Sequence, residues 1–308
     1  MRLLFAGTPD VALPSFEAVL ASDHDVLAVL TRPDAPSGRG RKLHPSPVAE
    51  RAEAEGFDVL KPGSTRDPEF LEQLRRLAPE ACAVVAYGGL LPANVLEVPE
   101  HGWINLHFSV LPAWRGAAPV QHAVRSGDSL TGATTFRIVE ELDAGPIYGT
   151  VTEPIGATDT SGDLLERLSH SGARLLVDTL DGIVAGTLDP RPQPSDDVTY
   201  ASKVGVDDVR IEWSRPAFAI DRLVRSGTPV PGAWTTFRDE RLKVGPVTVV
   251  TEAVDVPPGE IVTEKSRVLV GTGSVPVALG EVHPHGKRVM PADAWARGVH
   301  PQAAERLV

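Results

Sequence analysis

The first 185 residues alternate short apolar runs with segments of helical periodicity, and no other feature limits the possible folds so strongly. Residues 1–7 (MRLLFAG) form an apolar run that ends in Gly-Thr-Pro-Asp, and apolar residues at helical spacing follow over 11–20. The alternation continues, with strands expected over 26–30, 57–60, 81–86, 103–107, 131–138 and 147–153 and helices over 47–55, 68–77, 117–125 and 161–185. This order predicts an α/β domain with a doubly wound, mostly parallel sheet whose ligands bind at the carboxyl ends of its strands.

A proline-rich segment then separates a region of different character. Residues 188–197 (LDPRPQPSDD) hold three prolines and no apolar periodicity, which is typical of an extended linker. Beyond it, a helix is expected over 216–224 and short strands over 210–213, 234–237, 242–250, 260–263, 267–271 and 275–281. We therefore predict a sheet domain over 1–189, a linker over 190–206 and a small β-barrel over 207–308.

The negative net charge of −11 lies entirely in the first region. Residues 1–189 hold 15 Lys and Arg against 26 Asp and Glu, whereas residues 190–308 hold 15 of each. Within the acidic region, residues 32–42 (RPDAPSGRGRK) carry four basic side chains against Asp34 alone, a local charge of +3. Two interpretations of this Gly- and Pro-containing loop stay open: a solvated connection, or a flexible contact to a polyanion.

Cysteine use and hydropathy indicate a soluble protein. The single cysteine, Cys82, excludes an internal disulfide and lies in an apolar run, where we expect burial rather than nucleophilic chemistry. That run, residues 81–91, is shorter than the ~18 residues that a membrane span needs. The first residues also lack the apolar region and cleavage site of a secretory signal. We expect a cytoplasmic monomer that does not bind membranes.

Motifs for nucleotides and metals are incomplete. Residues 7–10 (GTPD) lie between an expected strand and helix but match neither GxGxxG nor GxxxxGK[ST], so neither NAD nor ATP is expected. His283 and His285 lie in the segment HPHGK without HExxH or clustered cysteines. We therefore expect a surface loop there and no metal site.

The segment 105–112 (NLHFSVLP) carries the first candidate chemistry. Because side chains alternate along a strand, Asn105 and His107 project from one face where the strand reaches the ligand-binding edge of the sheet. The Asn105 amide can donate to a developing oxyanion, and His107 can titrate near neutral pH or donate. Asp143, in the turn EELDAGP between two expected strands, could reach back to orient the imidazole. Taken alone, a capping role for Asn105 and His107 and a plain turn role for Asp143 stay open.

Taken together, these motifs resemble a known family. The pattern N-x-H-x-S-x-L-P followed by L-D-A-G is similar to the folate-dependent formyltransferases, which move a formyl group from 10-formyltetrahydrofolate to an amine. Longer stretches resemble, in order and spacing, the members that act on initiator methionyl-tRNA: FAGTPDVALPSFEAVL, TRPDAPSGRGRKLHPSPV, VVAYGGLLP, LPAWRGAAPVQHAVRSGD, TGATTF and DTSGDLLERL. The resemblance covers residues 1–213 and continues weakly to the last three residues. It implies a Rossmann-like sheet domain and an OB-like barrel that helps to hold the tRNA.

The resemblance also assigns roles to residues. It implies that Asn105, His107 and Asp143 form a catalytic trio and that the loop 33–44 contacts tRNA. The basic residues implied for that contact are Arg39, Arg41 and Lys42. The residues implied to border the folate are Tyr87, Gly88, Gly89, Leu90, Leu91, Pro92, Ser109, Leu111, Pro112, Glu140, Glu141 and Leu142. Two departures affect the expected pocket shape, since Phe108 stands where the family usually has Gly and Val110 where it usually has Leu.

Three alternatives remain at this level. A formyltransferase acting on a small amine, such as an amino sugar nucleotide or glycinamide ribonucleotide, would use the same trio. A hydrolase that releases formate would replace the amine by water, and a non-catalytic binding module would leave the trio unexplained. The basic loop and the additional barrel favour a large polyanionic substrate, because a small amine needs no second contact surface, although OB-like folds also serve other ligands.

Overall fold

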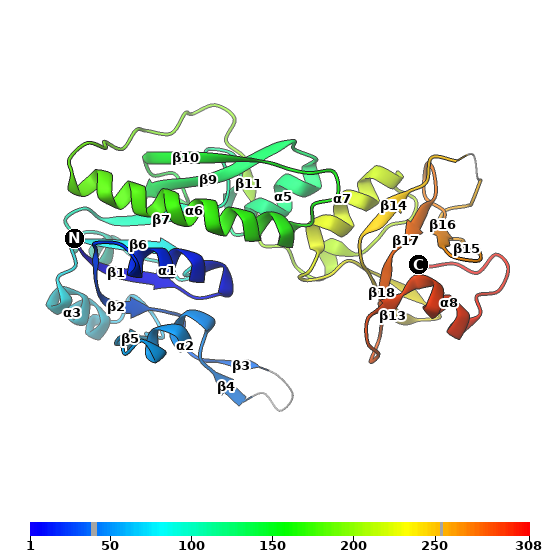
Figure 1. Ribbon diagram of the computed structural model, residues 1–308, viewed down its shortest axis with the longest axis horizontal. Coiled ribbons are helices and arrows are strands. Elements are labelled where there is room, and N and C mark those ends of the chain that lie inside the picture. Colours follow the sequence, from blue (N-terminus) through cyan, green and yellow to red (C-terminus); the bar gives the residue numbers. More distant parts are fainter. Residues whose placement is uncertain (38–41, 253–254) are drawn as a thin grey trace. The chain divides into compact units, whose positions relative to one another are not determined.

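The computed structural model describes residues 1–37, 42–252 and 255–308, and the chain divides into two compact units (Figure 1). The first unit comprises Met1–Gly116, Leu130–Pro154 and Leu165–Ala201. The second comprises Ala117–Ser129, Ile155–Leu164 and Ser202–Val308. The last division between the units therefore falls inside the expected linker. The sequence did not indicate that two short segments of the first region belong to the second unit.

The first unit is built on a seven-stranded sheet in the order β10-β9-β7-β6-β1-β2-β5. The strands are β1 (Arg2–Gly7), β2 (Asp25–Leu30), β5 (Val59–Leu60), β6 (Ala81–Val85), β7 (Trp103–His107), β9 (Leu130–Arg137) and β10 (Ile147–Pro154). The pairings from β5 to β7 are parallel, whereas β9 and β10 are antiparallel additions. The expected doubly wound, mostly parallel sheet is confirmed.

Helices pack on this sheet and begin where local chemistry favours a start. They are α1 (Leu13–Leu20), α2 (Pro47–Ala54), α3 (Pro68–Leu77), the short α4 (Ala93–Leu96) and the long α6 (Ser161–Val184), which runs along the sheet in Figure 1. The side chain of Ser46 accepts a hydrogen bond from the Ala49 N–H at 3.2 Å, and that of Asp67 accepts one from the Glu69 N–H at 3.0 Å. A proline follows each of these caps, because its missing N–H costs nothing in a first helical turn.

The central strands form the core of the first unit. Every side chain of β6 is buried, including Cys82, whose thiol pKa is raised by burial. The expected burial of this cysteine is confirmed.

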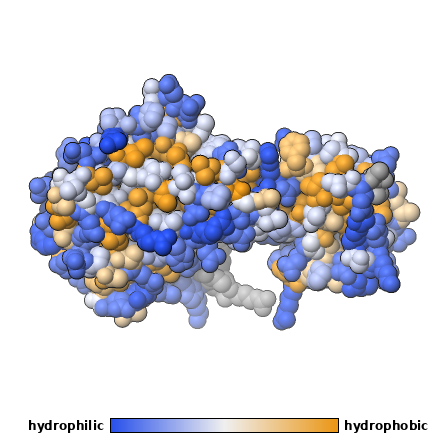
Figure 2. Space-filling view, turned by 45° about the horizontal axis from the view of Figure 1, so that its top comes forward, coloured by the Kyte–Doolittle hydropathy of each residue, from blue (hydrophilic) through white to orange (hydrophobic). Residues whose placement is uncertain are grey.

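Figure 2 shows apolar residues on the surface in view, interrupted by hydrophilic ones. Among the described residues, no helix combines the length and apolar composition that crossing a bilayer requires.

The order in which strands are added to the sheet reverses between two neighbouring parallel strands, and this point defines one edge of the sheet. The strands β1 and β6 lie side by side, but β1 leads to β2 on one side and β6 leads to β7 on the other. Doubly wound folds bind ligands in the crevice that opens at such a point. Here Thr8, after β1, donates from Oγ1 to the main-chain oxygen of Tyr87, after β6, at 2.9 Å. The next strand, β7, ends at His107, so this residue lies at the same edge of the sheet.

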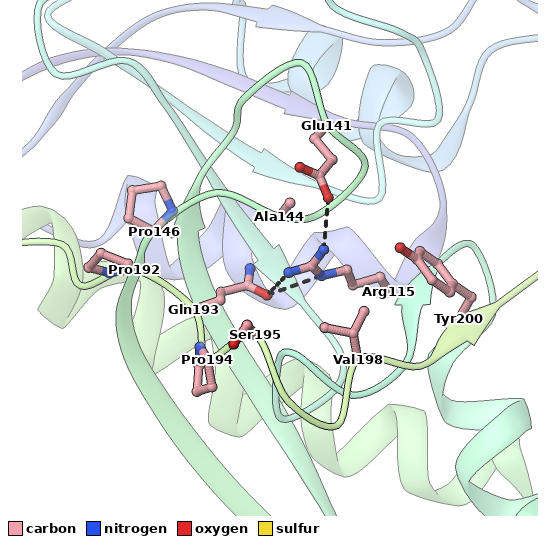
Figure 3. A pocket seen from close by; sticks show the side chains of 10 residues that line it. All are labelled: Arg115, Glu141, Ala144, Pro146, Pro192, Gln193, Pro194, Ser195, Val198 and Tyr200. Atoms are coloured by element: carbon pink, nitrogen blue, oxygen red, sulfur yellow. Dashed lines mark hydrogen bonds and ion pairs between the residues drawn. The ribbon is translucent and has the colours of Figure 1, made fainter.

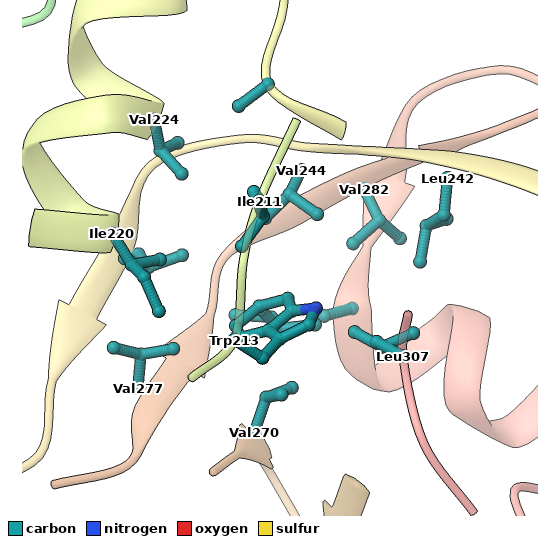
Figure 4. Close-up of a cluster of buried hydrophobic side chains, with 14 of the residues drawn as sticks. Ile211, Trp213, Ile220, Val224, Leu242, Val244, Val270, Val277, Val282 and Leu307 are labelled. Carbon is teal, nitrogen blue, oxygen red and sulfur yellow. The ribbon is translucent and has the colours of Figure 1, made fainter. Parts of the chain in front are cut away.

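The second unit contains two four-stranded antiparallel sheets around one hydrophobic core (Figure 4). One sheet joins β12 (Trp234–Phe237), β13 (Glu240–Val244), β18 (Glu281–Pro284) and β19 (Met290–Pro291). The other joins β14 (Val247–Val249), β17 (Val277–Leu279), β16 (Val268–Val270) and β15 (Ile261–Thr263). The helices of this unit include α5 (Pro119–Ser126), α7 (Ala217–Gly227) and α8 (Ala292–Val299). A smaller, mainly antiparallel β domain after the sheet domain is thus confirmed.

Some element predictions in this unit are wrong. Residues 242–250 form two strands, not one, because Gly245 and the proline after it turn the chain from one sheet into the other. Residues 210–213 form no strand; only a single bridge joins Arg210 to β12. Burial of Ile211 and Trp213 in the core produces the alternating apolar pattern, although the pairing with β12 is too short to form a strand. The helix α8 was not predicted. The expected surface loop is correct for His285, which lies exposed in the turn after β18, but His283 lies exposed in the strand itself.

Candidate active site

His107 is buried at the end of β7, with 6% of its surface exposed. Its Nε2 lies 2.9 Å from the main-chain oxygen of Trp114. Because a carbonyl oxygen can only accept, Nε2 must carry a proton, and the neutral ring leaves Nδ1 as an acceptor. Burial lowers the pKa of His107, while the charge of Asp143 and the contact with Trp114 raise it. The environment therefore favours the neutral imidazole, with Nδ1 able to take up a proton.

Asp143 approaches that acceptor nitrogen. Its Oδ2 lies 3.8 Å from His107 Nδ1 and accepts a hydrogen bond from the Gly116 N–H at 2.7 Å. The backbone of Asp143 is left-handed, with φ +48°, a conformation that Asp tolerates better than most residues. Two residues later, Gly145 passes so close to the oxygen of Arg137 that a Cβ atom would lie 1.7 Å from it. The turn therefore needs these residue types to bring its carboxylate to His107.

Asn105 precedes His107 by two positions on β7, so the two side chains share one face of the strand. Asn105 is half-buried, and its carboxamide has no hydrogen-bond partner among the residues that the structure describes. A half-buried amide without an internal partner is available to a ligand. The structure thus brings together His107 and Asp143 and places an unengaged donor on the same strand.

The loop after β6, residues 87–92, was expected to border the folate. The ring of Tyr87 is 2% exposed, and burial raises the pKa of its hydroxyl, which the charge of Arg32 opposes. Gly89 packs against this ring, since a Cβ there would lie 2.5 Å from Tyr87 Cε1. Gly88 has a left-handed backbone with φ +75°. Of the next residues, Leu90 is exposed, whereas Leu91 packs on the hydrophobic core. Pro92 then precedes α4. The loop is therefore anchored by a buried aromatic ring and presents Leu90 to solvent.

The segment after His107 is engaged with its own surroundings. Ser109 donates from Oγ to the oxygen of Ala113 at 2.6 Å, and its own carbonyl accepts from Thr134 Oγ1 at 2.7 Å. Leu111, buried next to Pro112, donates its N–H to Thr134 Oγ1 at 3.3 Å. These contacts stabilise the turn that carries the chain away from β7. They leave the Ser109 hydroxyl occupied. Of the two departures noted in the sequence, Phe108 is buried and Val110 is half-buried.

Glu140, Glu141 and Leu142 are exposed on the loop that carries Asp143. Glu141 Oε1 accepts a hydrogen bond from Arg115 Nη1 at 3.1 Å. Of the basic residues expected to contact tRNA, Lys42 is exposed in β4 (Lys42–His44), which pairs with β3 (Ala35–Ser37). Arg39 and Arg41 lie outside the described residues.

Residues missed by the sequence reasoning line a cleft of about 610 Å³ beside this loop (Figure 3). Arg115 and Gln193 line it together with Tyr200 and several prolines. Gln193 lies within the segment that composition identifies as a linker, so no local signal could have singled it out. No group of three or more His, Cys, Asp or Glu that could hold a metal ion occurs in the described part of the chain.

Both regions of the chain match models of one protein family. The model for "formyl transferase" matches residues 1–180, and that for "formyl transferase, C-terminal domain" matches residues 203–300. Together they cover most of the chain, and the chain belongs to the formyltransferase family.

Similarity to curated proteins narrows this class. The chain is 60% identical over 307 residues to a methionyl-tRNA formyltransferase of Thermobifida fusca (100% of this chain, 99% of the relative). It is 62% identical over 308 residues to one of Saccharopolyspora erythraea (100% of both). Within its family, the chain therefore groups with the methionyl-tRNA formyltransferases.

Solved structures share the fold at low identity. HypX of Aquifex aeolicus in complex with tetrahydrofolic acid has a TM-score of 0.68 at 16% identity; the match covers 96% of this chain and spans about half (47%) of that one. An N-formyltransferase of Helicobacter canadensis, in complex with folinic acid and dTDP-3-aminofucose, has a TM-score of 0.69 at 17% identity, covering 91% of this chain and 98% of that one. At this identity the likeness concerns the fold alone.

Proposed function

We infer that the chain transfers a formyl group from 10-formyltetrahydrofolate to the α-amine of initiator methionyl-tRNA, producing N-formylmethionyl-tRNA. The observation that carries this inference is the similarity of about 60% identity over the whole length, both units included, to methionyl-tRNA formyltransferases. The small-amine alternative is not favoured, because the amino-sugar enzyme shares only the fold, at 17% identity.

The residues at the sheet edge fit a formyl donor. When bound there, 10-formyltetrahydrofolate supplies an activated carbonyl carbon for the attacking amine. Asn105 supports this assignment because its amide is unengaged and can donate to the oxygen on which negative charge develops. A well-placed donor of this kind contributes ~3 kcal/mol to the stabilisation of a transition state.

His107 then serves as the proton acceptor. Its Nε2–H is held by the Trp114 carbonyl, so the proton lost by the amine goes to Nδ1. The imidazolium that results faces the Asp143 carboxylate, which lies 3.8 Å away and stabilises the positive charge. The same proton can pass to the folate nitrogen when its bond to the formyl carbon breaks. General base catalysis by a positioned histidine contributes about 10²- to 10⁴-fold.

The domain roles follow as part of the proposal. We assign folate binding to the first unit, with residues 87–92 and the loop of Asp143 at the pocket. We assign tRNA binding to Arg39, Arg41 and Lys42 and to the C-terminal region over 207–308. We also propose a cytoplasmic monomer, and sedimentation of the protein with charged tRNA should then give a 1:1 complex.

The proposed function is tested by direct formylation. The protein is incubated with 10-formyltetrahydrofolate and methionyl initiator tRNA, in parallel with an amino sugar nucleotide, glycinamide ribonucleotide and buffer alone. Formylation of methionyl-tRNA at least 100 times faster than of either small amine is expected. Preferential use of a small amine, or release of formate in buffer at the same rate, would overturn the assignment.

A further inference from the structure

Gln193 uses the full hydrogen-bonding capacity of its side chain on the candidate active site. Its Nε2 donates to the main-chain oxygens of Asp143, at 2.7 Å, and of Gly145, at 2.8 Å. Its Oε1 accepts from Arg115 Nε at 3.1 Å and from Arg115 Nη2 at 2.8 Å. Two donors and two acceptor positions are all that a carboxamide has. The amide orientation is therefore determined, because a reversed amide would turn its oxygen toward two carbonyl oxygens.

Arg115 fixes Gln193 in this orientation. Its guanidinium is nearly buried, and its remaining contact is with Glu141 at 3.1 Å. The main chain of Arg115 is also held, since its N–H donates to the Thr199 oxygen at 2.9 Å and β8 (Arg115–Gly116) pairs with β11 (Tyr200–Ala201). A rigid cation thus orients the amide that holds the loop.

Asp143 is consequently held at two points. Gln193 binds its carbonyl oxygen, and the Gly116 N–H binds its carboxylate. The residues before Asp143 on the loop are exposed, and its own φ of +48° is unfavourable without support. A loop of this kind would not keep the carboxylate 3.8 Å from His107 by local preference alone.

We propose that Gln193 is a positioning residue for formyl transfer, which holds the loop so that the Asp143 carboxylate faces His107. This inference rests on the proposed function of that site. Gln193 touches neither His107 nor Asn105 in the described contacts and acts only through Asp143 and Gly145. Through Gln193, the segment from residue 190 to residue 201 is connected to the candidate active site.

Residues 190–201 are held by main-chain hydrogen bonds on both sides of Gln193, so a variant at position 193 should fold. Arg191 and Ile147 exchange two main-chain hydrogen bonds of 2.7 Å, and β11 anchors the other end. Removal of the side chain between these anchors leaves both intact. Ser195, exposed in the same segment and without a hydrogen-bond partner among the described residues, provides a matched control.

The experiment compares Gln193→Ala, Gln193→Glu and Ser195→Ala in the full chain, with wild type in the same assay. We expect Gln193→Ala to lower kcat at least 10-fold while the KM for the formyl donor changes less than 3-fold. Gln193→Glu keeps the acceptor for Arg115 but places an oxygen against two carbonyl oxygens, so its kcat should be as low or lower. Ser195→Ala should match wild type. Unchanged kcat in both Gln193 variants would overturn the proposal.

Two further readouts separate positioning from a general structural effect. In an Asp143→Asn background, Gln193→Ala should lower kcat less than 3-fold, because the carboxylate that Gln193 positions is already absent. A 10-fold loss of kcat there would contradict the proposal. His107 titration by NMR needs no substrate, and its midpoint should move to lower pH in Gln193→Ala as Asp143 moves away. An unmoved midpoint overturns the positioning role, whereas an inactive wild-type enzyme with a shifted midpoint refutes the proposed function alone.

Discussion

A single main-chain contact determines how His107 can act. Because Trp114 accepts from Nε2, the nitrogen that faces Asp143 is a proton acceptor in the neutral ring. Sequence reasoning suggested that Asp143 could orient the imidazole. In the structure the Trp114 carbonyl also holds the ring, so under the proposed function the role of Asp143 is to stabilise the imidazolium. The common face of Asn105 and His107 could be predicted from the sequence, because side chains alternate along a strand. The contact of His107 with the carbonyl of Trp114, seven residues later, could not, because it depends on the path of the intervening turn.

The first prediction concerns the trio itself. His107→Ala and Asp143→Asn should each lower kcat by about 100-fold or more, because both groups act on charge in the transition state. The kcat of the double variant should be only slightly lower than that of the less active single variant, since the effects of groups that act as a unit are not additive. Circular dichroism should show an unchanged fold. Near wild-type kcat in either single variant would refute the trio.

The pH dependence follows from the same environment. Burial holds the pKa of His107 below its ordinary value of 6.5. Under the proposed function, the neutral ring is the active form. The value of kcat at saturating methionyl-tRNA should therefore persist below pH 6.5 and fall only as the pH drops through the lowered pKa; kcat/KM would also follow the α-amine of the free substrate. Asp143→Asn removes a charge that raises this pKa, so the acid limb of the residual activity should move to still lower pH. An acid limb at or above pH 6.5 in the wild type would contradict the assignment.

At the scale of elements, the sheet was predictable and the site contacts were not. Alternation and apolar runs are properties of neighbouring residues, so β1, β6 and β7 could be placed from the sequence. The loop of Asp143 depends on Arg115 and Gln193, which lie 28 or more positions away and in different elements. A proline-rich composition also conceals that residues 190–201 pack on the first unit. Such long-range pairings have no periodic signature.

The turn after β9 gives a prediction at this scale. Gly145→Ala would place a methyl group 1.7 Å from the Arg137 oxygen, so the loop of Asp143 must move. We expect kcat to fall at least 10-fold and the free energy of unfolding to fall by about 1–3 kcal/mol. Gly63→Ala is the matched control, because nothing lies within 4 Å of a Cβ there. Equal activity and equal Tm for the two variants would show that the loop accommodates the change.

At the scale of the whole molecule, the charge distribution limits where a polyanion can bind. Residues 1–189 are strongly acidic, so phosphate contacts in that region require a local basic cluster such as Arg39, Arg41 and Lys42. Replacing these three by Ala should lower kcat/KM for methionyl-tRNA and flatten its log–log salt dependence by roughly 1 to 3 units. Folate affinity should stay unchanged.

Arg75→Ala with Arg76→Ala removes two exposed cations from α3 and serves as the control for the loss of positive charge elsewhere on the first unit. An equal salt slope in the loop variant and in this control would identify the loop as a solvated connection.

The second unit is assembled from parts that are far apart in the sequence, and this affects the newly made chain. Its helix α5 packs with α7, and Arg222 of α7 donates to the Ser126 oxygen at 3.2 Å. About 90 residues separate the two helices, so at synthesis rates of about 5–20 residues per second α5 leaves the ribosome roughly 5 to 20 s before its partner. During that interval the apolar side chains of Val120, Ala123 and Val124 have no permanent cover. The nascent chain is therefore exposed to misassembly and chaperone capture while the later segments of both units are still being made.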